Sequence, residues 1–248
     1  MTMVANAEKV GVPATPELTA QMEVALLARA LWRVGYCDGI AGHITYDQGD
    51  GTWLANPFGL SWEELTASDI VRIDGSGHVV EGRLGVTPAI ELHLAIHRLR
   101  PHDQVVVHNH PRFATIWSAA KRFPPAYDQW SCVAVEAETQ IIPEYTGDVT
   151  QVEAARASAT ALGQANFALI ANHGILVVAN SITHAYHRAH ALEHRCEQAW
   201  RVQAMGGASP MPRVWEDKLG SVLNQLGGPH VWNAAVRKEI REDPSVLD

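Results

Sequence analysis

The sequence has 248 residues, of which 47% are hydrophobic and 19% charged, and its formal net charge is −8. These proportions are typical of a soluble globular protein that can bury a core without staples, and the acidic balance argues against a nucleic-acid partner, which needs a basic face. No run of about 18 apolar residues predicts a membrane span, and the three separated cysteines and the absence of an apolar leader favour a cytoplasmic protein.

The first half of the chain shows short helical and β patterns in alternation. After a flexible tail over residues 1–15, Thr15 and Pro16 predict the start of a helix over 17–35. Short β-branched or aromatic runs between turn residues then predict strands over 44–46, 52–54, 70–73 and 78–80. We expect a helical turn over 62–69, helices over 88–99 and 113–120, and a strand between those helices over 104–110.

The second half favours strand material over 133–142, a helix over 152–162, one buried strand over 168–178 that contains Gly174, and a long helix over 182–205. Residues 16–208 are therefore predicted to form a single domain of the α/β (α+β) class, a mixed sheet with helices packed on it. Residues 209–248 are expected to be a C-terminal extension with one helix over 232–242.

Two motifs stand out among the 13 histidines. His108 and His110 are two residues apart in a predicted strand, so their side chains point to the same face, about 6–7 Å apart at Cβ. His173 lies in another apolar segment, where a buried ring needs partners. Three imidazoles brought together suit one divalent ion. The alternative is that these residues are hydrogen-bonded core histidines.

The stretch from about residue 41 to 204 resembles the class II aldolase/adducin family. The resemblance is carried by six motifs in order, namely Ala41-Gly42-His43-Ile44-Thr45, Asn56-Pro57-Phe58-Gly59, Val79-Val80-Glu81-Gly82, His93 to Arg98 followed by Arg100-Pro101, His108-Asn109-His110 and Asn172-His173-Gly174. It implies a three-layer fold with a central, mostly antiparallel sheet between helices, and a homotetramer with active sites between subunits. It also implies that His108, His110 and His173 bind one divalent metal ion per subunit, whether Mn, Zn, Co or Fe.

Several positions depart from the sugar-phosphate aldolases of this family. Their phosphate-binding positions correspond here to Gly42-His43, Phe58-Gly59 and Thr87-Pro88, where Phe58 has no donor and Pro88 has no backbone N–H. We therefore expect a small, non-phosphorylated carboxylate substrate. Its predicted contacts are His43, Asn56, Gly59 and Thr87.

The catalytic glutamate of those aldolases corresponds to Ala89. Glu91 is the alternative base, although on a helix it points about 200° away from residue 89. The family's catalytic tyrosine falls near Gln129, and His93 is a candidate for a substrate or supporting contact. Tyr145 is expected either to line the cleft or to pack beside it.

A site with three histidines and no glutamate favours decarboxylation, because loss of CO₂ itself delivers the electron pair, whereas retro-aldol cleavage needs a base. The predicted function is a metal-dependent lyase, a decarboxylase of a hydroxy-substituted aromatic or heteroaromatic acid that acts through a metal-stabilised enolate. The alternatives are a retro-aldolase on a hydroxy-keto acid, a non-haem Fe(II) oxygenase, and a non-catalytic scaffold like an adducin head.

Overall fold

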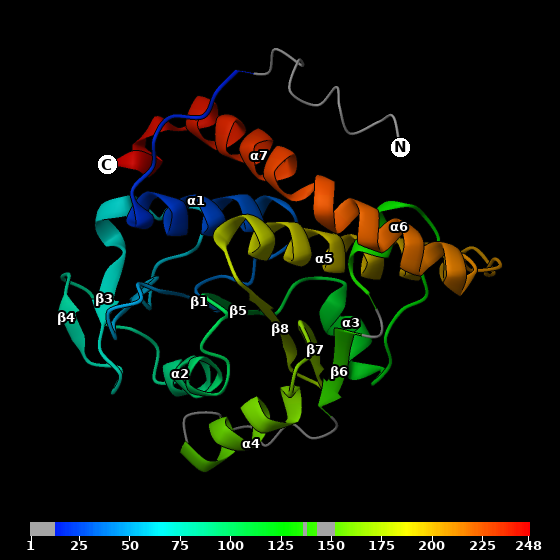
Figure 1. The fold of residues 1–248 in the computed structure, drawn as a ribbon, viewed down its shortest axis with the longest axis horizontal. Helices are drawn as coiled ribbons and strands as arrows, with labels where there is room; N and C mark the ends of the chain where they lie inside the picture. Colours follow the sequence, from blue (N-terminus) through cyan, green and yellow to red (C-terminus); the bar gives the residue numbers. More distant parts are fainter. Residues whose placement is uncertain (1–12, 136–137, 143–151) are drawn as a thin grey trace.

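The structure is a computed structural model, and it describes residues 13–135, 138–142 and 152–248 (Figure 1). Eight strands form one sheet. Their bounds are β1 His43–Asp47, β2 Trp53–Ala55, β3 Val71–Ile73, β4 Val79–Glu81, β5 Val105–Asn109, β6 Thr139–Ile142, β7 Phe167–Ile170 and β8 Gly174–Ala179. Their order across the sheet is β4-β3-β2-β1-β5-β8-β7-β6, and every neighbouring pair is antiparallel except β6 and β7.

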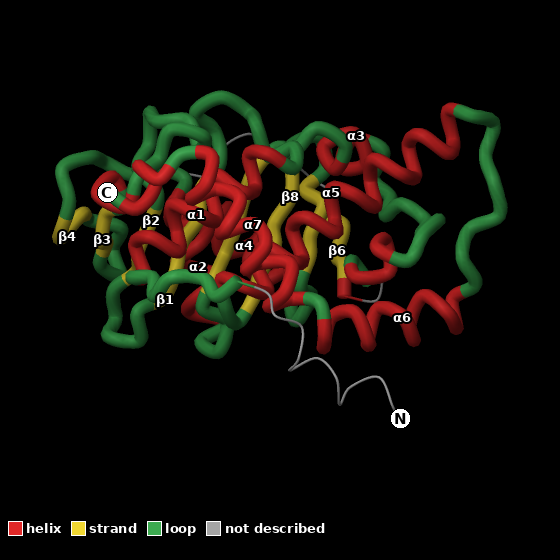
Figure 2. Tube along the Cα trace, turned by 90° about the horizontal axis from the view of Figure 1, so that it is seen from above, coloured by secondary structure: helices red, strands yellow, loops and turns green. Residues whose placement is uncertain are grey.

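Helices cover both faces of this sheet. In Figure 1, α1 and α5 lie on one face with α7 outside them, and α2 and α4 lie on the other. The tube in Figure 2 shows α6 at one end of the molecule, beyond the long loop that follows α5. The helices are α1 Ala20–Arg33, α2 Ile90–Leu99, α3 Ala114–Ala119, α4 Val152–Leu162, α5 Ile182–Ala204, α6 Arg213–Leu226 and α7 Gly228–Glu242, with short 3₁₀ turns at Ala67–Asp69, Trp130–Val133 and Pro244–Leu247.

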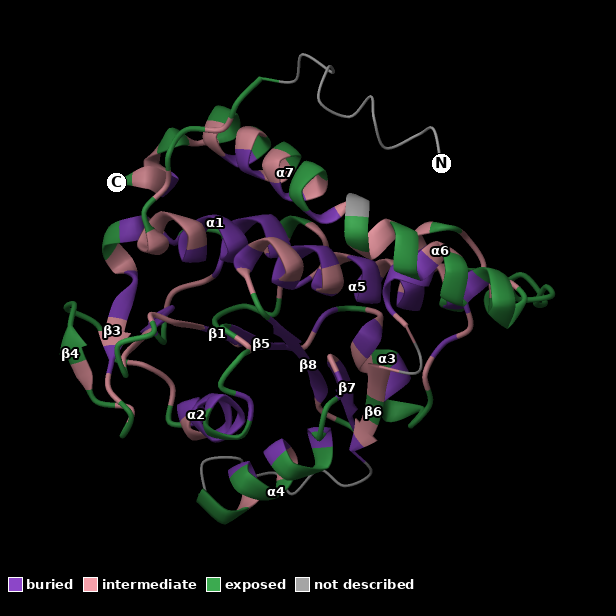
Figure 3. Cartoon of the chain, in the orientation of Figure 1, coloured by how far each residue is buried: buried purple, intermediate pink, exposed green. Residues whose placement is uncertain are grey.

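Side chains of the central strands point alternately to the two faces of the sheet, and each face has its own hydrophobic core. Val105 and Val107 of β5 pack in the core beneath α1 and α5, whereas Val106 packs in the core beneath α2 and α4. Successive side chains of a strand point to opposite faces, so His108 shares the face of Val106. Figure 3 shows the result, with buried residues on the sheet and on the inner sides of α1, α5 and α2.

Strand register places two residues of β1 beside that face. His43 lies opposite His108, and Thr45 lies opposite Val106. His43, Thr45 and His108 are all buried. His43, Thr45 and His108 therefore form a buried polar group on the α2 side of the sheet.

The predicted fold is confirmed: the chain forms a mixed α/β domain whose eight-stranded sheet is mostly antiparallel and flanked by helices. The helix predicted from Thr15 and Pro16 instead begins at Ala20, because Thr19 caps it by accepting a hydrogen bond from the Met22 N–H. Among the described residues, no helix is both long enough and apolar enough to cross a bilayer.

The prediction of one buried strand over 168–178 is wrong. The segment is an antiparallel hairpin in which Ile170 of β7 lies opposite Gly174 of β8. The turn between them needs a left-handed residue, and Asn172 supplies it at φ 58°. His173 therefore lies on a turn, where its N–H donates to the Ile170 carbonyl at 3.0 Å.

The C-terminal region contains two helices, α6 and α7, where the sequence predicted one. Trp232, Val236 and Val246 pack into the same core as α1 and α5. The ion pair between Arg29 of α1 and Asp243 at 2.7 Å holds the region against the rest of the fold. The domain boundary at residue 208 stays a prediction.

Candidate metal centre and cavity

His108, His110 and His173 come together at one end of the sheet. His108 is near the end of β5, His110 follows that strand directly, and His173 is on the β7–β8 turn. Each ring offers one nitrogen, and these three nitrogens lie within 4.8 Å of one another. Ligand atoms that share one ion at about 2.1 Å lie at most about 4.2 Å apart, so these rings need at most a small inward shift to bind one ion together.

Two of these rings are oriented by their Nδ1 atoms. His108 Nδ1 lies 2.8 Å from the Ile175 carbonyl oxygen, which can only accept a hydrogen bond. His110 Nδ1 lies 2.6 Å from the Asp38 carboxylate. Both rings therefore carry the proton on Nδ1 and leave Nε2 as a donor of its lone pair, the arrangement that is usual for metal-binding histidines.

The residues present fit a divalent cation. His110 Nε2 is buried and has no hydrogen-bond partner among the described residues, a state that costs free energy unless a ligand satisfies the atom. Burial lowers the pKa of His108 well below its usual value and lowers the pKa of His173 to about 4. Both rings are therefore neutral near pH 7, as metal ligands must be.

Two glycines permit the close packing around these histidines. A Cβ at Gly174 would lie 2.5 Å from the Asn109 carbonyl oxygen and 2.6 Å from His110 Cδ2. Gly42, at φ +97°, would place a Cβ 2.1 Å from the Asn109 side-chain nitrogen. A side chain at either position would displace the residues that carry the site.

A small cavity of about 140 Å³ opens beside the three histidines. Its walls are Ile40, Ala41, Gly42, His43, Phe58, Thr87, Ala89, His108, His110 and His173. A cavity of about 150 Å³ holds one benzene ring, so a single six-membered ring fits here. A larger cavity between α1 and α7 is lined mainly by charged side chains that already form ion pairs, such as Arg33 with Glu239 at 2.6 Å.

His43 connects the cavity to a buried row of polar side chains between β1 and α2. Its Nδ1 lies 3.0 Å from His93 Nε2, and His93 Nδ1 lies 2.9 Å from the Thr45 hydroxyl. The same hydroxyl lies 2.8 Å from His97 Nε2, and His97 Nδ1 lies 3.2 Å from the Asp103 carbonyl oxygen. His93 and His97 are one helical turn apart on α2, so both rings face the strand.

The other predicted substrate contacts divide into two groups. His43 and Thr87 line the cavity. Asn56 is buried and is used by the backbone, because its Oδ1 accepts from the Ile44 N–H at 2.7 Å and its amide donates to the Gly42 and Pro57 carbonyls. Asn56 and Gly59 are not among the cavity-lining residues.

Of the predicted proton-transfer residues that the structure describes, none lines the cavity. Glu91 pairs with Arg98 at 2.6 Å and does not line the cavity. Gln129 is exposed at the start of a 3₁₀ turn, and His93 contacts the cavity only through His43. Tyr145 lies outside the described residues.

Sequence reasoning missed three residues that support the site. Asp38 orients His110, and Thr45 and His97 complete the buried row behind His43. The four-residue spacing of His93 and His97 carried a signal for the last of these. Asp38 had none, because it lies in a glycine-rich turn and meets His110 only in the folded chain.

Comparison with known proteins agrees with this architecture. The model of the class II aldolase and adducin N-terminal domain matches residues 22–200, and the chain belongs to this family. It is similar to a 4-hydroxy-3-prenylphenylpyruvate oxygenase/4-hydroxy-3-prenylbenzoate synthase of Streptomyces roseochromogenus subsp. oscitans, with 32% identity over 85% of this chain and 76% of that protein.

It is also similar to the decarboxylase NovR of Streptomyces niveus, with 30% identity over 85% of this chain and 78% of that protein. Among solved structures, an aldolase II superfamily protein from Pseudomonas syringae superimposes with a TM-score of 0.82 and 27% identity, covering 92% of this chain and 94% of that one. The likeness therefore extends beyond the matched domain into the C-terminal helices.

Proposed function

We propose that this chain is a divalent-metal-dependent carbon–carbon lyase that decarboxylates a small hydroxy-substituted aromatic or heteroaromatic acid. The observation that carries the proposal is the composition of the cavity. Three imidazoles converge on it, and among the described residues that line it there is no carboxylate. Ala89 occupies the wall where the sugar-phosphate aldolases would have their glutamate.

The metal would be held by Nε2 of His108, Nε2 of His110 and a ring nitrogen of His173. When bound there, a divalent ion supplies Lewis-acid stabilisation of negative charge. In the proposed reaction the bond between carbon and carboxylate breaks, CO₂ leaves, and the electron pair that stays on carbon takes up a proton from water, which leaves hydroxide. A base is not needed to start that step, which agrees with the ion pairing of Glu91 to Arg98.

The cavity has room for one planar ring. Its volume is about 140 Å³, and the apolar side chains of Ile40, Phe58 and Ala89 line it together with the histidines. The similarity to a protein named a decarboxylase supports the same reaction class. The expected substrate is therefore a small ring that carries both a carboxylate and a hydroxyl group.

The test is CO₂ release by protein reconstituted separately with Mn²⁺, Zn²⁺, Co²⁺ or Fe²⁺. Hydroxybenzoates and hydroxypyridine carboxylates are offered without oxygen, and the metal-free protein is the control. We expect metal-dependent CO₂ release that needs no O₂. Cleavage of a hydroxy-keto acid into two carbonyl products, with no CO₂ from the acids, would contradict the proposal in favour of a retro-aldolase.

A second candidate function is a non-haem Fe(II) oxygenase, which the similarity to a protein named an oxygenase favours. Three histidines also suit Fe(II). The same panel separates the two activities when it is repeated in air with an oxygen electrode. O₂ consumption that requires Fe²⁺ and accompanies all CO₂ release would identify the oxygenase.

Two further expectations join this proposal. A folded protein that takes up no metal would identify a non-catalytic scaffold, and metal content distinguishes that case. The homotetramer implied by the family resemblance stays a prediction, which sedimentation velocity of the full chain would check.

A further inference from the structure

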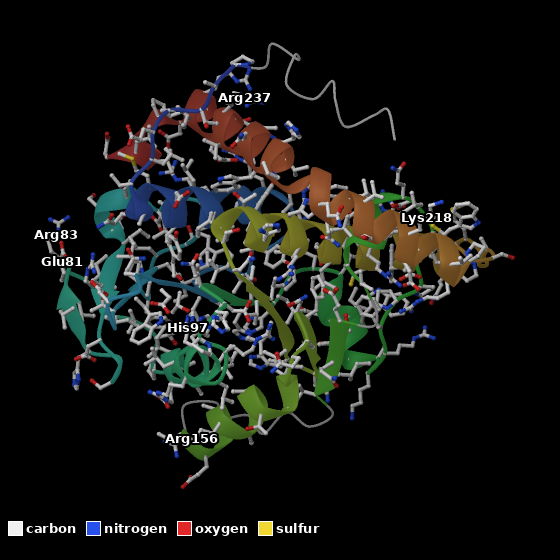
Figure 4. All side chains as sticks on the ribbon, in the orientation of Figure 1. Glu81, Arg83, His97, Arg156, Lys218 and Arg237 are labelled. Carbon is white, nitrogen blue, oxygen red and sulfur yellow. The ribbon has the colours of Figure 1, made fainter. Side chains whose placement is uncertain are left out.

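The polar row behind the cavity is a continuous hydrogen-bond chain. It runs from the Asp103 carbonyl through His97, Thr45 and His93 to His43, and we call these residues the β1–α2 chain. His93 and Thr45 are 0% exposed, and His97 is 4% exposed. Figure 4 labels His97 on the inner side of α2, whereas the labelled Arg83 and Arg156 lie at the periphery of the molecule.

The Asp103 carbonyl, at the end of the β1–α2 chain away from the cavity, fixes which atom donates in each hydrogen bond. The Asp103 carbonyl oxygen has no hydrogen to give, so His97 Nδ1 must be the donor across their 3.2 Å contact. Burial lowers the pKa of His97 to about 4, so the ring is neutral near pH 7. A neutral imidazole has one donor and one acceptor nitrogen, and His97 Nε2 is therefore an acceptor.

This acceptor at His97 determines the donor and the acceptor in each of the next hydrogen bonds. The Thr45 hydroxyl must donate to His97 Nε2, so its oxygen is free to accept from His93 Nδ1. His93, neutral because it is wholly buried, then has an acceptor at Nε2. His43 Nδ1 must consequently donate to His93 Nε2 across 3.0 Å. The opposite direction would set the Asp103 oxygen against a lone pair of His97.

We propose that the β1–α2 chain fixes His43 in the Nδ1–H tautomer, so that Nε2 serves the cavity as a hydrogen-bond acceptor that binds a hydroxyl group of the substrate. His43 lines the cavity, and its ring centroid lies 4.9 Å from that of His108. Among the described residues its Nε2 has no hydrogen-bond partner, whereas Nδ1 is engaged by His93. Thr45, His93 and His97 are positioning residues that act through His43.

The proposal narrows the substrate class, and this part of it rests on the proposed function. An acceptor nitrogen binds a hydroxyl group, which can donate, and disfavours a carboxylate or an ether oxygen at the same place, since neither carries a hydrogen. The carboxylate of the substrate must therefore lie away from His43 Nε2, and its hydroxyl must lie beside it.

The first test reads the tautomer directly in the full chain, without substrate. Long-range ¹H–¹⁵N correlation spectra of the ¹⁵N-labelled, Zn²⁺-loaded protein at neutral pH distinguish protonated from unprotonated ring nitrogens. Comparison with a His43→Gln spectrum assigns the His43 signals. We expect a protonated Nδ1 and an unprotonated Nε2. A protonated Nε2 in the unchanged protein would overturn the proposal.

The second test asks whether the β1–α2 chain determines the tautomer of His43. Thr45→Val keeps the shape of the side chain but removes the hydroxyl, whereas Thr45→Ser keeps the hydroxyl. We expect a mixture of His43 tautomers in Thr45→Val and the single Nδ1–H form in Thr45→Ser. An unchanged single tautomer in a folded Thr45→Val protein would show that the chain does not control His43.

The third test probes the ligand by calorimetry on the Zn²⁺-loaded protein. 2-Hydroxybenzoate should bind at least about tenfold more tightly than 2-methoxybenzoate, because a site built for a hydroxyl rejects an analogue that lacks its hydrogen. His43→Phe should abolish this preference. Equal affinities, or no binding of either compound, would overturn the acceptor role. Failure of the CO₂ assay leaves these three readouts intact, so the two proposals fail separately.

Discussion

Two groups of histidines lie on the same side of one sheet, and they differ in how their nitrogens are satisfied. In the β1–α2 chain, His93 and His97 are buried and both nitrogens of each ring have partners. In the metal centre, His110 is half-buried and its Nε2 has no hydrogen-bond partner among the described residues. Burial of a polar ring is tolerated when partners compensate it, and the metal centre, whose three ring nitrogens lie within 4.8 Å of one another, is where one ion would satisfy this nitrogen.

The largest expected effect separates metal binding from folding. His108→Ala combined with His173→Ala removes two of the three converging nitrogens, so we expect stoichiometric metal to be lost while circular dichroism stays unchanged. His78→Ala with His102→Ala, two exposed histidines elsewhere, is the matched control. Full metal content in the first double variant, measured by atomic emission, would refute the assignment of the metal centre.

The β1–α2 chain should show the opposite behaviour, with a loss of stability and retained metal. Thr45→Val leaves His93 Nδ1 and His97 Nε2 without their partner. Each of these two unsatisfied buried groups costs about 1–3 kcal/mol, so the free energy of unfolding should fall by about 2–6 kcal/mol in urea titrations. Thr45→Ser should recover most of it. A loss confined to metal affinity would mean that the two groups are not distinct.

The orienting contact of His110 should affect metal affinity but not stability. Asp38→Asn weakens the acceptor that lies 2.6 Å from His110 Nδ1. Loss of such a supporting contact typically reduces metal affinity about 10–100-fold, which competition with a chelator measures. Asp50→Asn, which changes an exposed loop carboxylate, is the control. Equal affinities in the two variants would show that Asp38 does not orient the ring.

The smallest effect concerns pH. Burial lowers the pKa of folded His97 to about 4, whereas the unfolded residue titrates near 6.5. The unfolded state thus binds more protons between these values, and stability that is full above pH 6.5 is lost as pH falls toward 4. His97→Gln should reduce the loss of unfolding free energy between pH 7 and 5 by about 2 kcal/mol. An identical pH dependence in urea titrations of both proteins would contradict the buried, neutral state of His97.

The sequence predicted the parts of this arrangement that depend on local pattern. The two-residue spacing of His108 and His110 predicted that their side chains lie together, and their ring nitrogens do lie within 4.8 Å of each other. The β-branched run before them located β5, and residues 182–205 were correctly predicted as a long helix, α5. The position of His173 on a turn was not predicted, because the left-handed backbone of Asn172 interrupts a run that looks like one strand. Glu91 was named as the alternative base, and its ion pair with Arg98 could not be predicted from the sequence.

The sequence pattern could not predict the residues whose role depends on how β1 and β5 are aligned. Thr45 faces α2 because β1 pairs with β5 in a particular alignment, and that alignment puts His43 opposite His108. A shift of one residue would have turned Thr45 to the other core. Only the paired strands therefore show that one hydroxyl bridges two histidines.

The position of His173 on the β7–β8 turn has a consequence for how the chain holds together. An ion shared by His110 and His173 would act as a reversible cross-link between the end of β5 and a hairpin that lies far along the sequence. An ion that binds only the folded chain raises the free energy of unfolding. The increase is about 2.7 kcal/mol when the free metal concentration is 100 times the dissociation constant. Metal availability would then change the stability of the folded protein as well as its proposed chemistry.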